Sequence, residues 1–285
     1  MTIARGVVLW ILVTCGNAWA AGAVDQIAAR QQINIGYRSD ASPFSYRDDQ
    51  GKPAGYMIDL CRTVAAHVET AVGKPLKLNF VRVPIDQMTR YVQSGSVDLL
   101  CSATTDTAER RANMAFSFPV FISHIKVLVR RADDVNSLSS LRGGPMVVIG
   151  RSTADALAAQ RGAELQWNVT RALNADAAMS QLDAGMVKGY ARDDVLLMGQ
   201  LALSQRPQAY ALLPDALTRE PIAIAIRPGD TDLEKLVNAG LSVALKSGSL
   251  EAAYQRWFMR PVPPARQALG LPMSAELRNE LEKLR

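Results

Sequence analysis

Two long apolar segments divide this sequence into two series of alternating strands and helices. Residues 122–129 and 221–226 are extended and apolar. The first series places strands and helices alternately at 33–37, 57–72, 76–83, 85–93 and 97–100. Turn residues at 48–53 also predict a hairpin between 44–46 and 55–56. Its helices repeat apolar residues at helical spacing, and its strands are short and apolar. This repetition predicts an α/β fold with a mainly parallel sheet.

A second α/β series lies between the two apolar segments. Its strands and helices are expected at 146–149, 153–160, 175–184, 189–190 and 195–202. Further helices at 233–246 and 250–258 follow the second segment. The two segments indicate a double crossover between two lobes, which gives three expected parts. Lobe I comprises 21–125 and 224–260, lobe II comprises 126–223, and a C-terminal strap and helix occupy 261–285. Ser274 can cap this last helix.

The first twenty residues have the pattern of a secretory signal peptide. Arg5 is the only charge before Asp25, residues 6–14 are apolar, and Ala18-Trp19-Ala20 provides an A-x-A cleavage site. A lipoprotein signal ending at Cys15 is the rival interpretation, although a bulky Thr precedes that Cys. Cleavage after residue 20 changes the charge count from 32 − 27 = +5 to 31 − 27 = +4.

Cleavage also leaves two cysteines, Cys61 and Cys101, in an exported chain. An even number of cysteines in an oxidising compartment favours a disulfide. Two buried thiols that pack as small apolar groups are the alternative. Both states stay open at this point.

The composition excludes several function classes. A modest positive charge without a cluster of Lys and Arg argues against nucleic-acid binding. Only two histidines, His67 and His124, are present and lie far apart, so a His-rich metal site is excluded. The sequence has no Walker loop, G-x-G-x-x-G, C-x-x-C or G-x-S-x-G motif, and no cofactor is expected.

Polar residues follow the short strand at 97–100 and begin a helix. Asp106 and Glu109 have the spacing of a capping box, and Arg110 lies one turn into the helix. Free N–H groups at a helix start bind anions, and the arginine fork suits a carboxylate. A capped helix with a surface arginine is the plainer alternative.

Three other positions repeat this pattern at strand ends, where ligands bind in α/β sheets. Ser152 and Thr153 follow the strand at 146–149 and begin a helix. The strand that begins at 189–190 ends in Arg192-Asp193-Asp194, and Asp193 could accept an ammonium there, although helix capping is the commoner use of such a residue. Arg38 follows the first strand and could equally be a solvated loop cation.

Several motifs together resemble one known family, the periplasmic amino-acid-binding proteins of ABC transporters (solute-binding proteins, family 3). The resemblance covers roughly residues 30–270, and its glutamate/aspartate-binding branch is the most similar. The motifs are Gly36-Tyr37-Arg38, Pro43-Phe44-Ser45-Tyr46, Gly55-Tyr56, Asp59-Leu60-Cys61, Val97-Asp98, Thr104-Thr105, Glu109-Arg110, Phe116-Ser117, Trp257-Phe258 and Pro261-Val262-Pro263-Pro264.

The resemblance implies a two-lobed type II periplasmic-binding-protein fold that closes on a free amino acid. Arg110 and Thr105 would hold the α-carboxylate, with Ser152 and Thr153 adding to it from the second lobe. Asp193 would take the α-ammonium, and Arg38 would meet an acidic side chain. The implied protein is a periplasmic monomer that delivers its ligand to an ABC permease in the inner membrane.

This sequence departs from the acidic branch around the side-chain pocket. Ala103 stands where that branch usually has Ser, Met88 lies where a second pocket arginine is missing, and Arg151 replaces a small residue. The ligand is therefore expected to be acidic or polar, and its identity stays open. The competing functions are an enzyme similar to periplasmic cyclohexadienyl or arogenate dehydratases and a ligand sensor for a receptor kinase.

Overall fold

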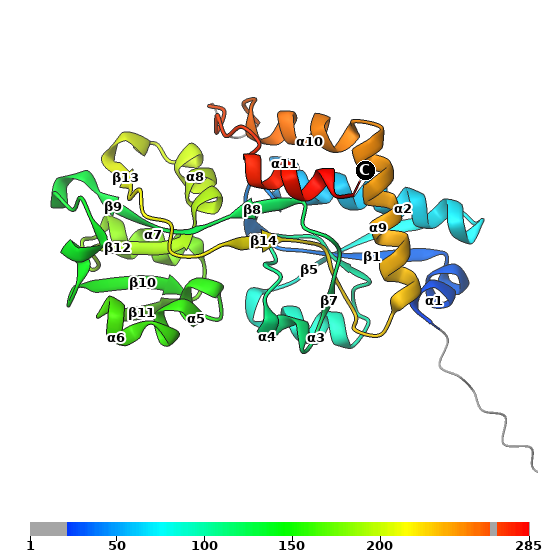
Figure 1. Cartoon of the computed structure of the whole chain (residues 1–285), viewed down its shortest axis with the longest axis horizontal. Helices are drawn as coiled ribbons and strands as arrows, with labels where there is room; N and C mark the ends of the chain where they lie inside the picture. Colours follow the sequence, from blue (N-terminus) through cyan, green and yellow to red (C-terminus); the bar gives the residue numbers. More distant parts are fainter. Residues whose placement is uncertain (1–21, 263–266, 285) are drawn as a thin grey trace, which may run out of the picture.

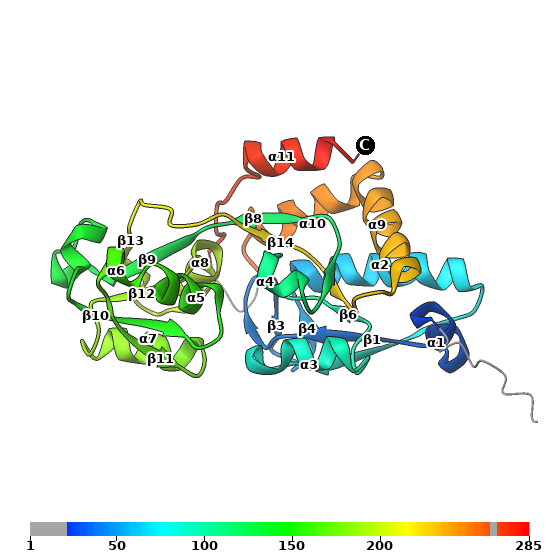
Figure 2. The same cartoon turned by 60° about the horizontal axis from the view of Figure 1, so that its bottom comes forward.

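The fold is built around two five-stranded sheets that lie side by side (Figures 1 and 2). The structure is a computed structural model and describes residues 22–262 and 267–284. The signal peptide expected at 1–20 and the last prolines of the strap, at 263 and 264, lie outside the described residues. Within the described part of the chain, no helix is long and apolar enough to span a membrane.

The first sheet, with its helices, forms the first lobe. Its strands in spatial order are β5 (Lys77–Arg82), β1 (Gln32–Tyr37), β6 (Leu99–Leu100), β15 (Ala225–Ile226) and β7 (Ala115–Phe116). Strand β1 pairs in parallel with β5 and β6, whereas β15 is antiparallel to both of its neighbours. A small antiparallel sheet of β2 (Asp40–Ala41), β3 (Ser45–Arg47) and β4 (Pro53–Ala54) confirms the expected hairpin.

Helices cover this first sheet. They are α1 (Ala23–Arg30), α2 (Tyr56–Val72), α3 (Met88–Gln93) preceded by the turn η1 (Ile85–Gln87), α4 (Ala108–Arg111), α9 (Thr231–Lys246) and α10 (Ser249–Phe258). Helix α2 buries Leu60, Val64 and Val68, which recur every four residues along one face. It ends at Gly73, whose left-handed φ of 65° suits glycine.

The second sheet and its helices form the second lobe. Its strands in spatial order are β11 (Asn168–Ala172), β10 (Pro145–Ile149), β12 (Gly189–Asp193), β9 (Ile125–Arg130) and β13 (Tyr210–Leu212). Its helices and turns are η2 (Arg131–Asp133), η3 (Leu138–Leu141), α5 (Thr153–Gln160), α6 (Gly162–Leu165), α7 (Ala175–Asp183), α8 (Asp194–Leu203) and η4 (Pro207–Ala209). The lobe boundaries drawn from the sequence stay a prediction.

A two-stranded ribbon connects the lobes. Strands β8 (Phe121–Ser123) and β14 (Glu220–Ile222) pair antiparallel, with Glu220 opposite Ser123. Figure 1 shows this ribbon running from one lobe to the other. The two apolar segments of the sequence therefore lie next to each other, and each continues into a strand of a five-stranded sheet.

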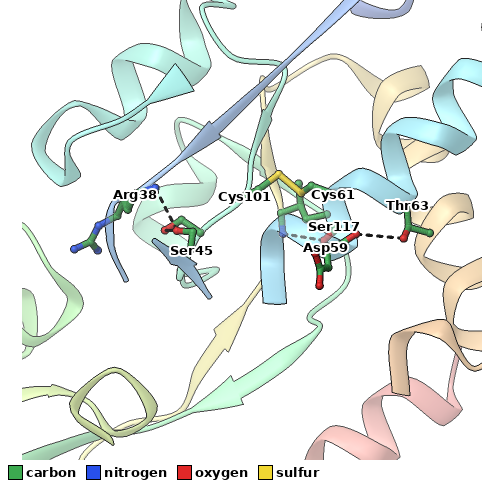
Figure 3. Close-up of a disulfide and its surroundings, with 9 residues drawn as sticks. Arg38, Ser45, Asp59, Cys61, Thr63, Cys101 and Ser117 are labelled. Atoms are coloured by element: carbon green, nitrogen blue, oxygen red, sulfur yellow. Dashed lines mark hydrogen bonds between the residues drawn. A yellow bond between two sulfur atoms is a disulfide. The ribbon is translucent and has the colours of Figure 1, made fainter. Parts of the chain in front are cut away.

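A disulfide joins Cys61 in α2 to Cys101, just beyond β6 (Figure 3). Of the two states that the sequence leaves open for these cysteines, the structure has the bonded one. Beside the disulfide, Ser45 Oγ donates a hydrogen bond to Ser102 Oγ (3.0 Å). The bond thus ties a helix to the strand end that leads into α4.

The C-terminal helix α11 (Ala275–Glu282) packs on the first lobe. Ser274 Oγ accepts a hydrogen bond from the Leu277 N–H (3.0 Å), so the predicted cap is confirmed. Leu277 and Leu281 are buried in the first-lobe core, as expected for a packing strap. The helix also contacts strand β8, and Glu276 forms an ion pair with Arg219, the residue before β14.

Candidate functional site

A cleft of about 890 Å³ lies between the lobes. Its first-lobe wall is formed by η1, α3 and α4, and its second-lobe wall by α5 with Arg171. Glu220 of the ribbon and nearby Thr218 complete the lining. Of the residues singled out from the sequence, Arg110, Ser152 and Thr153 line this cleft. Arg38, Thr105 and Asp193 do not line it and are buried.

Arg110 lies in the short helix α4. Its Nη1 donates to the carbonyl oxygen of Thr105 (3.0 Å), and within the described residues it forms no ion pair. Burial lowers the pKa of the guanidinium, while the carboxylates of Asp193 and Glu220 act to raise it. The rest of the fork is therefore available to an anion.

The cap of α4 differs from the sequence expectation. Thr107 Oγ1 accepts from the Arg110 N–H (3.2 Å), so Thr107 is the N-cap. The predicted capping box of Asp106 and Glu109 is wrong, because Asp106 forms an ion pair with Arg111 instead. Thr105 is 2% exposed and forms an isolated β-bridge with Ile222 of the ribbon. This bridge fixes the backbone to which Arg110 is bonded.

Ser152 and Thr153 lie at the start of α5 on the opposite wall. Ser152 Oγ accepts from the Asp155 N–H (3.2 Å) as the N-cap, and both hydroxyl residues are half-buried. The neighbouring Arg151 has a left-handed φ of 63°, which asparagine or glycine adopts more readily. Arg151 also donates from Nη1 to the carbonyl oxygen of Asp86 across the cleft (3.4 Å).

Asp193 ends strand β12 and is 9% exposed. Its Oδ1 is buried and has no hydrogen-bond partner among the described residues. Burial and the nearby carboxylate of Glu220 raise the pKa of Asp193 to about 6, although Arg192 and Arg110 oppose the shift. The charges of Arg192 and Arg110 thus compensate the burial of this carboxylate only in part, and its Oδ1 lacks the hydrogen bond that buried polar atoms normally have.

The next residue, Asp194, has a different role. Its Oδ1 accepts from Ser123 Oγ (2.7 Å), from the His124 N–H (3.2 Å) and from the Val195 N–H (2.8 Å). These bonds hold the start of α8 to the end of β8. Asp194 is thus tied to the backbone, whereas the Asp193 side chain has no hydrogen-bond partner at Oδ1.

Glu220 is a further polar residue of the cleft that was not predicted from the sequence. This residue begins β14, is 4% exposed, and has a buried Oε2 without a hydrogen-bond partner among the described residues. It lines the cleft and lies close enough to Asp193 and Arg110 to act on the pKa of both. The one available signal was a carboxylate at the first position of an apolar crossover strand.

Arg38 is 4% exposed and points away from the disulfide (Figure 3). Its Nε and Nη2 donate to the two carboxylate oxygens of Asp40, each at 3.0 Å. Burial raises the pKa of Asp40 and the charges of Arg38 and Arg192 lower it, with a net shift downward. Arg38 is therefore paired with a carboxylate of its own lobe and is not a solvated loop cation.

Arg192, the neighbour of Asp193, completes this group from the second lobe. It is 3% exposed, and its Nη2 donates to the carbonyl oxygen of Asp40 (3.0 Å). Its Nη1 donates to Gln200 Oε1 (3.4 Å). Of these two buried guanidinium groups, only that of Arg38 is hydrogen-bonded to the carboxylate of Asp40, and the three groups together carry one excess positive charge.

Two sets of charges are brought together from distant parts of the chain. Arg110, Asp193 and Glu220 form the first set, and Arg38, Asp40 and Arg192 form the second. Arg38 acts on the pKa of Arg110, and Arg192 on that of Asp193, so the two sets adjoin. No group of three or more His, Cys, Asp or Glu side chains in the described residues is arranged to hold a metal ion.

The sequence profile of the bacterial extracellular solute-binding proteins, family 3, matches residues 33–260. The chain belongs to this family. The match covers both lobes and the ribbon of this family 3 protein, so the cleft lies within the region that defines the family.

Individual proteins resemble this family 3 protein over most of its length. A glutamate/aspartate import solute-binding protein of Salmonella typhimurium is 28% identical over 273 residues, covering 94% of this chain and 89% of that protein. The solute receptor for L-cysteine of Neisseria gonorrhoeae matches with a TM-score of 0.74 and 26% identity, covering 84% of this chain and 94% of that one.

A third match is a solved ancestral amino acid-binding protein described as a precursor of cyclohexadienyl dehydratase. Its TM-score is 0.72 and its identity 25%, with 83% of this chain and 99% of that chain covered. The structural neighbours have the type II periplasmic-binding-protein fold, and this family 3 protein has the same fold. The fold class expected from the sequence is thus confirmed.

Proposed function

We propose that this family 3 protein is an extracytoplasmic receptor that captures a free amino acid and delivers it to an ABC permease. The observation that carries the proposal is the placement of Arg110 and Asp193. Arg110 belongs to the first lobe and Asp193 to the second, and each acts on the pKa of the other. A zwitterion between them would meet a cation at its carboxylate and an anion at its ammonium.

The remaining polar groups fit an α-carboxylate held by both lobes. Ser152 and Thr153 line the second-lobe wall, and their hydroxyl groups would add to the hold of Arg110. The carbonyl of Thr105 keeps the Arg110 fork in place. Because groups from both lobes contact the amino acid, its binding would shift the protein toward a closed form.

An acidic or polar side chain is the preferred specificity. The relative from Salmonella typhimurium is named for glutamate and aspartate import. In this chain, Arg38 and Arg192 carry two positive charges and Asp40 carries one negative charge, so one positive charge would face the ligand. The pairing of Arg38 with Asp40 reduces the preference for a second carboxylate, and glutamine is therefore a serious competitor of glutamate.

An enzyme on the same fold is the second candidate, and one observation favours it. Asp193 has a pKa of about 6 beside the cleft, so it could donate a proton near neutral pH. The ancestral neighbour described as a dehydratase precursor is itself an amino acid-binding protein. Turnover of prephenate or arogenate would establish the enzyme, and the absence of turnover with a bound amino acid would support the receptor. A sensor for a receptor kinase would show the same binding and would need a signalling partner.

The deciding experiment is a thermal-shift screen of the mature protein with the twenty standard amino acids and small dicarboxylates. Isothermal titration then measures the affinity of each amino acid that raises the melting temperature. Stabilisation by L-glutamate, L-aspartate or L-glutamine would support the proposal. A protein that no amino acid stabilises would contradict it.

A further inference from the structure

The carboxylate of Glu220 lacks a structural partner. Its Oε2 is buried without a hydrogen bond, and within the described residues the side chain forms no ion pair. The backbone of Glu220 pairs with Ser123 in the ribbon, which any residue at this position could do. Since a buried, unpaired carboxylate destabilises the fold, the ribbon does not explain why an acid stands there.

Asp193 approaches the same region from the second lobe with a second unpaired oxygen. Its Oδ1 is also buried without a hydrogen bond, and Glu220 is the nearby charge that most raises its pKa. Arg110 balances one of these two carboxylates, and the excess negative charge is offset only in part by Arg192, which has hydrogen bonds to Asp40 and Gln200. Two adjacent anions are unfavourable in the ligand-free protein and become favourable when a cation lies between them.

We propose that Glu220 is a second acceptor for the ligand's ammonium group, acting with Asp193. The inference rests on the function proposed above and adds a binding residue from the ribbon. An ammonium carries three N–H donors, and one carboxylate at the end of a strand rarely satisfies all three. Asp193 would accept from one side and Glu220 from the base of the cleft, with the carboxylate of the same amino acid on Arg110.

This assignment restricts the ligand class. Two carboxylates at one nitrogen favour a free primary ammonium and disfavour an N-acylated amino acid or a deaminated acid. Glutarate, which is glutamate without its α-amino group, would meet two uncompensated anions.

The experiment is a titration of the wild type and of Glu220→Gln with L-glutamate, L-glutamine and glutarate. Glutamine keeps the size and the polar tip of the side chain, so circular dichroism and melting should show a folded variant. We expect Glu220→Gln to weaken L-glutamate and L-glutamine about 10- to 100-fold, the loss expected for one hydrogen bond between charged groups. Glutarate should bind Glu220→Gln at least as well as it binds the wild type.

Glu282→Gln is the control with the same chemical change. Glu282 is an exposed carboxylate at the end of α11 and does not line the cleft. Its substitution should change each affinity less than threefold. If Glu282→Gln weakens the amino acids as much as Glu220→Gln does, the effect is one of general charge and the assignment is overturned.

The two proposals fail in different ways. If the wild type binds amino acids and Glu220→Gln binds them equally well, the role of Glu220 is overturned and the receptor function stays intact. Equal losses for L-glutamate and glutarate would overturn the ammonium contact, because glutarate has no ammonium. Wild type that binds none of the twenty amino acids would overturn the receptor function and, with it, this inference.

Discussion

Arg38 and Asp40 form a two-point ion pair, in which Nε and Nη2 each donate to one carboxylate oxygen at 3.0 Å. Arg38 is buried, and the carbonyl oxygen of Asp40 also accepts a hydrogen bond from Arg192. A pocket that opposed a ligand's side-chain carboxylate with an unpaired Arg38 would be strongly selective for acids. With the proposed ligand, the pair with Asp40 would lower this selectivity for acids.

Replacing Asp40 by Asn should therefore sharpen the preference for acidic ligands. The substitution keeps the side-chain shape and removes one negative charge beside Arg38 and Arg192. We expect the affinity for L-glutamate to rise several-fold to about tenfold relative to that for L-glutamine, which corresponds to roughly 1 kcal/mol. Isothermal titration with both ligands measures the ratio.

Asp49→Asn serves as the control for this experiment, because Asp49 is an exposed carboxylate in the hairpin of the same lobe. It should leave the ratio unchanged. An unchanged ratio in Asp40→Asn as well would mean that the ligand's side chain does not approach Arg38.

Arg110→Ala should weaken every amino acid that the wild type binds. The α-carboxylate is common to all of them, and removing one partner of a desolvated charge pair costs on the order of 2–5 kcal/mol. That range corresponds to roughly 30- to several-thousand-fold in affinity.

Arg38→Ala, in contrast, should weaken the binding of L-glutamate and L-aspartate more than that of L-glutamine. Equal losses on all three ligands in Arg38→Ala would mark Arg38 as a structural residue.

Asp193→Asn should abolish binding and stabilise the ligand-free protein at neutral pH. Burial and Glu220 raise the pKa of Asp193 from 3.8 to about 6, so the folded state holds this proton more tightly than the unfolded state. The ionised carboxylate thus destabilises the fold by an amount that grows from about pH 4 to about pH 6 and is constant above. At pH 7.5, removing it should add up to about 3 kcal/mol to the free energy of unfolding.

Urea unfolding of the wild type and the variant at pH 4 and pH 7.5 checks this prediction. The difference between the two proteins should be small at pH 4 and large at pH 7.5. Asp194→Ala is the contrasting variant, because Asp194 accepts hydrogen bonds from Ser123, His124 and Val195. The free energy of unfolding of Asp194→Ala should be lower than that of the wild type by about 1–3 kcal/mol. If Asp194→Ala weakens binding and Asp193→Asn does not, the residue that accepts the ammonium is Asp194 and not Asp193.

The disulfide between Cys61 and Cys101 should contribute substantially to stability. Its cysteines are 40 residues apart, and closing a loop of that length is worth roughly 3–4 kcal/mol in the chain-entropy model. The double variant Cys61→Ala/Cys101→Ala should unfold at a lower denaturant concentration, and its free energy of unfolding should be smaller by about that amount. Thiol titration of the denatured, unreduced mature protein should detect no free thiol, and two free thiols would contradict the bond.

Local patterns predicted the elements well and the contacts between distant residues less well. The apolar spacing of α2 and the hydroxyl of Ser274 act within one or two helical turns, so the sequence sufficed for both. The capping of α4 was wrong because Thr107, one residue after Asp106, provides the bond. The side chain of Asp106 forms an ion pair with Arg111 and does not cap the helix.

The site shows the same limit. Arg38 and Asp40 are two residues apart, but their pairing depends on the turn that begins β2, which a pattern of residue types does not specify. Glu220 and Asp193 come close only because the ribbon brings the end of the second lobe back to the cleft. Asp193 is predicted as a binding residue from its place at a strand end, whereas Glu220 begins a strand and has no such signal.

The position of β15 has a consequence for the order in which the chain can assemble. This strand, at Ala225–Ile226, fills the gap between β6 and β7, which end at residues 100 and 116. A chain that emerges from its N-terminus therefore cannot complete its first sheet until more than a hundred further residues have followed β7. The second sheet draws all its strands from residues 125–212 and can form as one continuous piece. The first lobe begins earlier in the sequence, but its sheet can be completed only after all the strands of the second sheet have emerged.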